Sequence, residues 1–275
     1  MYKIIEIDDL ESRELEVYTS MLENQIKHIY EPEPGLFIAE SPVVIERALA
    51  AGYTAESVLT DYEHLEEIKS IIEANGVDNT IEIYVADAKV LAKIKGFEMT
   101  RGALCACRRK SLASIEEICA GKSRIAVMEE VQNPTNVGAI FRSAAAMGIE
   151  AVVLTFGSAD PLYRRAIRVS MGNVFLIPWT VATKDEDVIG TLKAAGFTTL
   201  AMALKDNTLS IDDPLLKKQQ KLAIVLGTES EGLTDSTIEA CDYTVKIPMA
   251  KGVDSLNVAA ASAVAFWELT KSKGD

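Results

Sequence analysis

Residues 222–232 read L-A-I-V-L-G-T-E-S-E-G, an apolar run followed by a loop with a glycine at each end. A short apolar run that ends in such a loop predicts a strand buried on both faces of a parallel sheet. Gly227 and Gly232 allow a ligand to approach the backbone closely. Glu229 and Glu231 lie between them and would repel a phosphate group, so the loop suits a neutral or cationic ligand.

The same alternation of strand and helix extends over the C-terminal half of the chain. It predicts an α/β domain whose parallel sheet is covered by helices on both faces. The expected strands are 125–128, 151–155, 174–177, 198–203, 222–226 and 245–247, and the expected helices are 139–147, 164–170, 185–195 and 257–271. Ligands of such sheets usually bind beyond the carboxyl ends of the strands.

Two further loops of unusual composition stand at predicted strand ends. Residues 133–142, N-P-T-N-V-G-A-I-F-R, offer Asn136 as a helix cap and place Arg142 in an apolar segment without an acidic neighbour in sequence. Capping alone explains the asparagine, whereas an unpaired cation beside a helix start suits a phosphate group. Residues 247–258, I-P-M-A-K-G-V-D-S-L-N-V, lead into an Ala-rich helix, and Ser255 is either its cap or part of an adenosine pocket.

In this order, the three loops resemble motifs 1, 2 and 3 of the SpoU (TrmH-like) branch of the SPOUT RNA methyltransferases. The matching residues are Asn136, Gly138 and Arg142 of N-x-G-x-x-x-R, Gly227, Glu229 and Gly232 of G-x-E-x-x-G, and Ile247–Met249 with Ser255–Val258. Residues 164–178 also resemble the family segment between motifs 1 and 2. Each motif alone is weak, but three in order at predicted strand ends are specific.

The resemblance implies an α/β C-terminal domain with a parallel sheet and a deep trefoil knot, which fold rules alone would not suggest because knots are rare. It also implies S-adenosylmethionine as the cofactor and a homodimer whose site lies near the subunit interface. Gly227, Ile247 and Leu256 would contact the cofactor mainly through backbone groups. The full expected set of cofactor contacts is Ala203, Leu226, Gly227, Ile247, Met249 and Leu256.

The reaction that the resemblance implies is the attack of an RNA ribose 2′-hydroxyl on the methyl group of the sulfonium. Arg142 matches the arginine that the family assigns to activating this hydroxyl, but a free arginine is a poor base at neutral pH. We therefore expect Arg142 to bind the phosphate beside the target ribose and to stabilise the developing alkoxide. Asn136, Glu229, Ser255 and Asn257 match the other positions that shape the catalytic site.

Arg164, Arg165 and Arg168 form a second group of cations, in a stretch without acidic residues between Asp160 and Asp185. At helical spacing, Arg164 and Arg168 share a face. A solvated helix face explains them, and so does contact with an RNA backbone. With Arg142, they are the expected RNA-binding residues.

Charge divides the chain into two parts. The first 100 residues hold 8 basic and 21 acidic side chains and the rest hold 20 of each, so the net charge of −13 lies entirely in the first part. This asymmetry predicts a domain boundary near residue 100 and argues against RNA binding through a broad basic face there. We expect an N-terminal α/β domain at 1–107, with a long helix at 13–30, a partly basic linker at 108–122, and the methyltransferase domain at 123–275.

The N-terminal domain has a looser resemblance of its own. F-I-A-E at 37–40 and R-G-A-L-C-A at 101–106 resemble parts of the L30e-like substrate-binding domain found in many members of the family. That domain often accompanies ribosomal RNA as the substrate, which favours ribosomal over transfer RNA.

Composition excludes several classes of protein. The chain is 48% hydrophobic and 25% charged, an ordinary globular mixture. No stretch approaches the roughly 20 apolar residues of a membrane-spanning helix, and the N-terminus lacks the apolar core of a secretory signal, so we expect a cytoplasmic protein without a membrane partner. The four cysteines and two histidines lack zinc-site spacing, so we expect free, mostly buried thiols and no metal.

Three functions fit the sequence. An RNA 2′-O-ribose methyltransferase is the leading one. A non-catalytic RNA- or ribosome-binding protein that kept the knotted fold is the alternative, although it would have little use for Asn136, Arg142, Glu229 and Asn257 together. Methylation of a base, as in other SPOUT branches, is the third, and the S-L-N-V form of motif 3 favours ribose.

Overall fold

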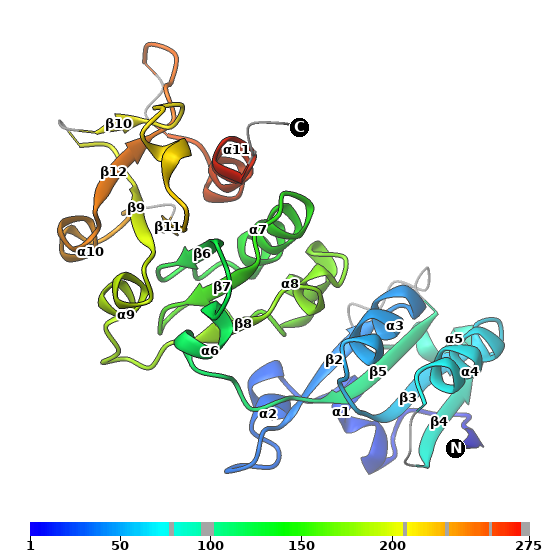
Figure 1. Cartoon of the computed structure of the whole chain (residues 1–275). Coiled ribbons are helices and arrows are strands. Elements are labelled where there is room, and N and C mark those ends of the chain that lie inside the picture. The colour runs from blue at the N-terminus through cyan, green and yellow to red at the C-terminus, as the bar shows by residue number, and fades with distance from the viewer. Residues whose placement is uncertain (77–79, 95–101, 206–207, 229–230, 253–254, 271–275) are drawn as a thin grey trace. The chain divides into compact units, whose positions relative to one another are not determined.

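A computed structural model describes residues 1–76, 80–94, 102–205, 208–228, 231–252 and 255–270 (Figure 1). The chain forms two compact units. The N-terminal unit comprises Met1–Ser111 and Leu162–Leu176, and the C-terminal unit comprises Leu112–Pro161 and Ile177–Asp275. Among the described residues, no helix combines the length and the apolar character needed to cross a membrane.

The N-terminal unit is a five-stranded sheet between two layers of helices. Its strands are β1 (Tyr2–Glu6), β2 (Leu36–Glu40), β3 (Ala55–Asp61), β4 (Ile81–Ala86) and β5 (Ala103–Arg108), and its helices are η1 (Arg13–Leu15), α1 (Glu16–Thr19), α2 (Glu23–Lys27), α3 (Pro42–Ala50), α4 (Leu65–Ala74), α5 (Ala88–Leu91), α8 (Arg164–Val169) and η3 (Asn173–Phe175). The strand order is β1-β4-β3-β5-β2. β1, β4 and β3 are parallel, whereas β5 runs antiparallel to both of its neighbours. Leu15, Tyr18, Ile26 and Leu91 bring η1, α1, α2 and α5 into one core cluster on this sheet.

The long helix expected at 13–30 is wrong, because the segment forms η1, α1 and α2 with breaks between them. The Thr19 hydroxyl donates to the Leu15 carbonyl at 3.1 Å, and the backbone N–H of Leu22 donates to the Gln25 side chain at 2.7 Å, which starts α2. Such side-chain bonds compete with a continuous helix. β1, which the sequence reading did not identify, pairs in parallel with β4 at the edge of the sheet.

Residues 162–176 belong to the N-terminal unit although they lie within the C-terminal half of the sequence. Arg47 Nη1 donates to the Met171 carbonyl at 2.6 Å and to Asn173 Oδ1 at 2.7 Å. The ring of Phe175 packs 5.6 Å from that of Phe37 and 5.3 Å from that of Tyr53. These contacts favour a compact turn, so the strand expected at 174–177 is wrong and the segment forms η3 instead.

The C-terminal unit is built on a seven-stranded sheet. Its strands are β6 (Arg124–Met128), β7 (Ala151–Leu154), β8 (Trp179–Val181), β9 (Thr198–Met202), β10 (Leu209–Ser210), β11 (Leu222–Leu226) and β12 (Tyr243–Lys246), and its helices are α6 (Ile115–Cys119), α7 (Pro134–Ala146), α9 (Val188–Ala194), η4 (Leu216–Lys218), α10 (Asp235–Ala240) and α11 (Val258–Thr270). The order is β10-β12-β9-β11-β6-β7-β8, and each of these neighbouring pairs is parallel. The predicted parallel α/β architecture is therefore confirmed, and the knot stays a prediction.

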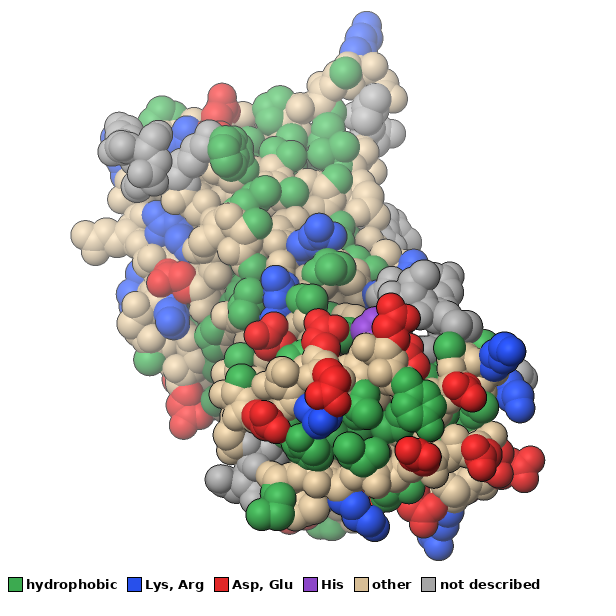
Figure 2. All heavy atoms as spheres, turned by 90° about the vertical axis from the view of Figure 1, so that its right-hand side faces the viewer, with side chains coloured by type: hydrophobic (Ala, Val, Ile, Leu, Met, Phe, Trp, Pro, Cys, Tyr) green, Lys and Arg blue, Asp and Glu red, His purple; other side chains and the backbone are tan. Residues whose placement is uncertain are grey.

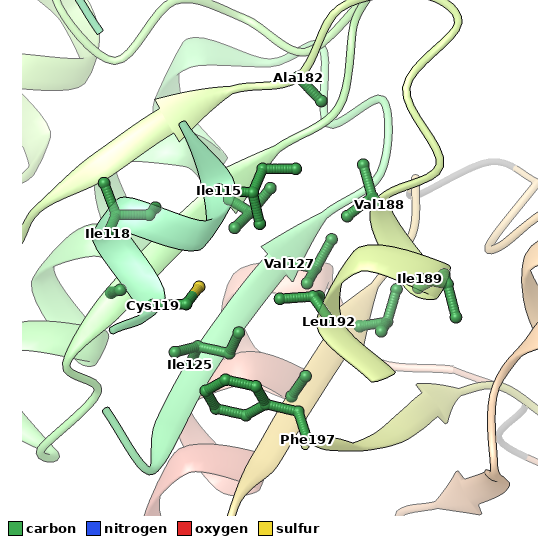
Figure 3. Packing of buried hydrophobic residues seen from close by; sticks show 14 of the residues in the cluster. Ile115, Ile118, Cys119, Ile125, Val127, Ala182, Val188, Ile189, Leu192 and Phe197 are labelled. Atoms are coloured by element: carbon green, nitrogen blue, oxygen red, sulfur yellow. The ribbon is translucent and has the colours of Figure 1, made fainter. Parts of the chain in front are cut away.

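Helices cover both faces of this sheet (Figure 1). On one face, Ile115 of α6 and Leu192 of α9 pack with Val127 and Val225 of the central strands in one buried cluster (Figure 3). On the other face, α7 packs along α11. The sheet thus presents the carboxyl ends of its strands between two helical layers, where ligands of such folds bind.

Two helix starts differ from the sequence expectation. α7 begins at Pro134, and its cap is Asn133, whose Oδ1 accepts the Thr135 N–H at 2.8 Å. Asn136, expected as the cap, is instead buried in the first turn at 7% exposure. At α11, Asn257 Oδ1 accepts the Ala259 N–H at 2.9 Å, so this cap is formed by Asn257 and not by Ser255.

Basic side chains at 108–110 contact other residues of the N-terminal unit. The guanidinium of Arg108 lies 4.8 Å from the ring centroid of Tyr30, and Lys110 Nζ donates to the Ala51 carbonyl at 2.6 Å. Further along the expected linker, the chain forms α6 behind a capping box in which Ser114 and Glu117 exchange hydrogen bonds. Part of the expected linker is therefore a helix.

Candidate functional site

A cavity of about 610 Å³ opens at the carboxyl ends of β12, β9, β11 and β6, four adjacent strands of the C-terminal unit. Parallel strands bring their carboxyl ends to one edge, which is why segments far apart in sequence meet here. The walls are formed by the residues after β6 and β9, by 226–228 and 231–235 around the end of β11, by residues of the 245–249 segment, and by the start of α11.

The loop after β11 owes its shape to Gly227. A Cβ on Gly227 would lie 2.3 Å from the carbonyl carbon of Gly232, so no other residue fits without moving the backbone. The N–H of Thr228 donates to the Gly232 carbonyl at 3.0 Å, and the N–H of Gly232 donates back at 3.2 Å. Gly232 has a φ of 73°, a left-handed conformation that glycine adopts readily. The loop is therefore a tight turn folded against the end of β11.

The six residues expected to contact a cofactor all line this cavity. They come from three parts of the chain: one follows β9, two lie at the end of β11, and three surround the β12–α11 connection. The residues are Ala203, Leu226, Gly227, Ile247, Met249 and Leu256. Apolar side chains dominate this set, which suits the flat, partly apolar surface of a nucleoside.

The expected catalytic residues are brought together in part. Asn257 Nδ2 donates to Asn136 Oδ1 at 3.4 Å, so motifs 1 and 3 meet directly. Ser255 lines the cavity. Arg142 is exposed on α7 and is not among the described residues that line the cavity. Glu229 lies outside the described residues.

The three arginines of α8 lie in the N-terminal unit. Arg164 Nη2 lies 3.5 Å from Glu40 Oε2, a carboxylate that is only 5% exposed. Its backbone N–H also donates to Glu23. Arg165 is exposed and Arg168 is half-buried. Arg164 therefore has a structural partner within its own unit, whereas contact of these arginines with RNA stays a prediction.

Several residues of the cavity wall were missed by the sequence reading. Glu129 directly follows β6 and is 8% exposed, and Lys205 and Asp235 lie on the wall beside Ala203 and Thr234. Glu129 could have been found from its place at the carboxyl end of a predicted strand, the rule that identified the other loops.

Among the residues that the structure describes, the cavity wall carries more negative than positive charge. Its carboxylates are Glu129, Glu130, Glu231 and Asp235, and its cations are Lys205 and Lys246. Lys205 Nζ donates to Asp235 Oδ1 at 2.8 Å, and this bond holds the pKa of that carboxyl below its ordinary value. The balance disfavours a phosphorylated ligand and favours one that is neutral or cationic.

Comparisons with known proteins agree with this geometry. The model of the SpoU rRNA Methylase family matches residues 123–267. An uncharacterized tRNA/rRNA methyltransferase of Mycobacterium bovis is 40% identical over 238 residues, which are 86% of this chain and 81% of the relative. A 23S rRNA (guanosine-2'-O-)-methyltransferase, RlmB, of a Burkholderia species is 30% identical over 195 residues, or 70% of this chain and 78% of that protein.

A solved structure shares the fold over nearly the whole length. The crystal structure of an AdoMet-bound rRNA methyltransferase from Sinorhizobium meliloti superimposes with a TM-score of 0.81 and 23% identity, and the match covers 97% of each chain. The fold of this chain is therefore shared by a protein of known structure.

Proposed function

The chain belongs to the SpoU rRNA methylase family, and from this premise we propose that it transfers a methyl group from S-adenosylmethionine to a ribose 2′-hydroxyl of RNA. The observation that carries the proposal is the cavity at the ends of β9, β11 and β12, around which all six expected cofactor residues gather. The names of its relatives support an RNA substrate, and that of the Burkholderia relative supports the ribose hydroxyl.

The cavity suits S-adenosylmethionine on three counts. Its volume of about 610 Å³ falls within the range of about 300–1,000 Å³ typical of small-molecule sites. Its apolar residues, among them Leu226, Ile247 and Leu256, can enclose an adenine ring. Its excess of carboxylates complements a cationic ligand. When bound, S-adenosylmethionine supplies a methyl group made electrophilic by its positively charged sulfur.

The residues of the chain have to position the ribose and stabilise the charge that develops as its 2′-hydroxyl loses a proton. Asn136 and Asn257, joined at 3.4 Å, hold motif 1 against motif 3. A guanidinium offers only N–H donors and no acceptor, so Arg142 acts as a donor to the neighbouring phosphate and to the developing alkoxide. The proton leaves the hydroxyl as the new C–O bond forms and the methyl–sulfur bond breaks, and it passes to water.

We propose that the enzyme is a homodimer whose second subunit completes the site. Arg142 does not line the cavity within one chain, although α7, which carries it, packs along α11 beside the cavity. The same α11 exposes Val264 at 39% and Trp267 at 56%. Large exposed apolar side chains on one helix suit an interface between subunits.

Replacing Trp267 with Glu should convert the dimer to a monomer, because a buried interface does not accommodate an unpaired carboxylate. Multi-angle light scattering after size exclusion should then give the mass of one chain instead of two, and methyl transfer should fall with it. Leu112→Glu, at another exposed apolar residue of the same unit, is the control and should keep the dimer mass. A dimeric Trp267→Glu protein would exclude this face.

We propose ribosomal RNA in the cytoplasm as the substrate. Many carboxylates lie on the face of the N-terminal unit that Figure 2 shows. Their negative charge disfavours binding of the RNA phosphate backbone over a broad surface there. Recognition by that unit must then use shape or a few specific contacts, which suits a folded ribosomal RNA element. We also propose that this unit is an L30e-like substrate-binding domain.

The proposed activity is tested with purified protein, labelled S-adenosylmethionine and unmodified total RNA. We expect micromolar binding of the cofactor by calorimetry and label in RNA, with the modified riboses mapped by their resistance to alkaline cleavage. Absence of cofactor binding would exclude the enzyme and leave the RNA-binding alternative. Label on a base instead of a ribose would correct the reaction while keeping the cofactor.

A further inference from the structure

Glu129 connects both ends of the loop that forms one wall of the cavity. Its backbone N–H donates to the carbonyl of Leu226, the last residue before the loop, at 2.8 Å. Its side-chain Oε1 accepts the N–H of Thr234, at the exit from the loop, at 2.8 Å. Its Oε2 accepts the hydroxyl of Thr237 on α10. One residue directly after β6 thus holds the start of the loop, its end and the helix that follows.

The surroundings of the Glu129 carboxylate favour this role. The residue is 8% exposed, and a buried carboxylate is costly unless it accepts hydrogen bonds. It lines the cavity at the carboxyl ends of the strands and also a second cavity of about 630 Å³ beside α9. Thr234 lines both cavities as well, so its bond to Glu129 forms part of the partition between them. Loss of this bond would free the partition to move toward either space.

We propose that Glu129 is a positioning residue that clamps the two ends of the loop after β11, at Leu226 and Thr234, in the positions required to bind S-adenosylmethionine. Gly227 leaves no space between the two strands of this turn, so a shift at Thr234 is transmitted to Gly232 and Gly227. The proposal rests on the proposed function for its ligand, whereas the clamp itself is a property of the chain. Removal of the groups that orient the ligands of a metal site typically costs about 10- to 100-fold in affinity or activity, and we expect an effect of the same order for this clamp.

The clamp is tested first without any cofactor, by hydrogen exchange of the Thr228, Gly232 and Thr234 amides. In Glu129→Ala these amides should exchange about tenfold faster, since local opening becomes easier. Glu239→Ala, at an exposed glutamate on the same α10, removes an equal charge away from the loop and should exchange as the wild type does. If these three amides exchange at the wild-type rate in Glu129→Ala, the clamp is overturned. This outcome does not depend on which ligand the protein binds.

Cofactor binding is the second readout. Glu129→Ala should raise the Kd and KM for S-adenosylmethionine about tenfold and leave the KM for RNA within about twofold. Glu129→Gln should recover most of the affinity, because its amide oxygen can face the Thr234 N–H while its amino group donates to Thr237. If Glu129→Gln binds S-adenosylmethionine as weakly as Glu129→Ala does, the loss of affinity comes from the lost charge and not from the hydrogen bonds, which would overturn the clamp. Faster exchange with unchanged affinity would make Glu129 a merely structural residue and would also overturn the proposal.

Thr237→Val supplies a milder variant in case Glu129→Ala does not fold. It removes the Thr237 hydroxyl, which donates to Glu129 and accepts from the Thr234 hydroxyl, and keeps the bond from the Thr234 N–H to Glu129. Affinity should fall about threefold, and most of this loss should disappear in the Glu129→Ala background. Additive losses would show that the two groups act separately and would contradict a shared clamp. If the wild-type protein binds no S-adenosylmethionine, the proposed function fails, and the exchange measurement still decides the clamp.

Discussion

Arg142→Ala should lower methyl transfer by about 100- to 1,000-fold, the usual cost of removing a group that stabilises developing negative charge. The affinity for S-adenosylmethionine should stay nearly unchanged, because Arg142 is exposed on α7 and the cofactor cavity is lined by other residues. Single-turnover assays at saturating cofactor and RNA, together with calorimetry of cofactor binding, measure the two effects separately.

Arg142→Lys is the matched variant, since it keeps the charge and loses the planar fork of donors. It should retain RNA binding and recover only part of the turnover. Unchanged turnover in Arg142→Ala would remove this residue from the mechanism. A loss of cofactor affinity equal to the loss of turnover would assign it to the cavity instead.

The parts of the site that sequence could predict are those fixed by local chemistry. Gly227 and Gly232 were identified because a loop with close backbone contacts requires glycine, and both occupy such positions. Leu226, Ile247 and Leu256 were expected around one ligand because of the resemblance to the SpoU family, and all three line the cavity. The carboxyl ends of parallel strands meet at one edge of the sheet, which explains why these residues lie together. For these residues, the local sequence pattern and the geometry of the sheet indicate the same site.

The parts that sequence could not predict depend on partners distant in the chain. Glu129 gains its role only because Thr234, 105 positions later, folds back onto it. Arg164 seemed to lack an acidic partner, yet Glu40, far earlier in the chain, lies 3.5 Å away. Asn136 looked like a helix cap, but Asn133 takes that place and frees Asn136 to meet Asn257. Tertiary contacts override local propensity in each case.

Gly227→Ala should abolish cofactor binding and lower stability by about 3 kcal/mol or more, at the upper end of the cost of overpacking. The added methyl group would lie 2.3 Å from the Gly232 carbonyl carbon and 2.4 Å from the Leu233 nitrogen. Both atoms are backbone, so no side chain can rotate away and the whole turn has to move. Thermal unfolding and calorimetry with S-adenosylmethionine measure the two effects.

Gly148→Ala separates this clash from the general cost of adding a methyl group to a glycine. Gly148 has a φ of 77°, and a Cβ there would meet no atom within 4 Å. Its substitution therefore costs only the strain of a left-handed residue, about 1–2 kcal/mol, and cofactor affinity should be kept. If Gly227→Ala binds S-adenosylmethionine as tightly as Gly148→Ala does, the turn after β11 is not part of the cofactor site. The assignment of the cavity would then have to move to the β12–α11 side, where Ile247, Met249 and Leu256 remain.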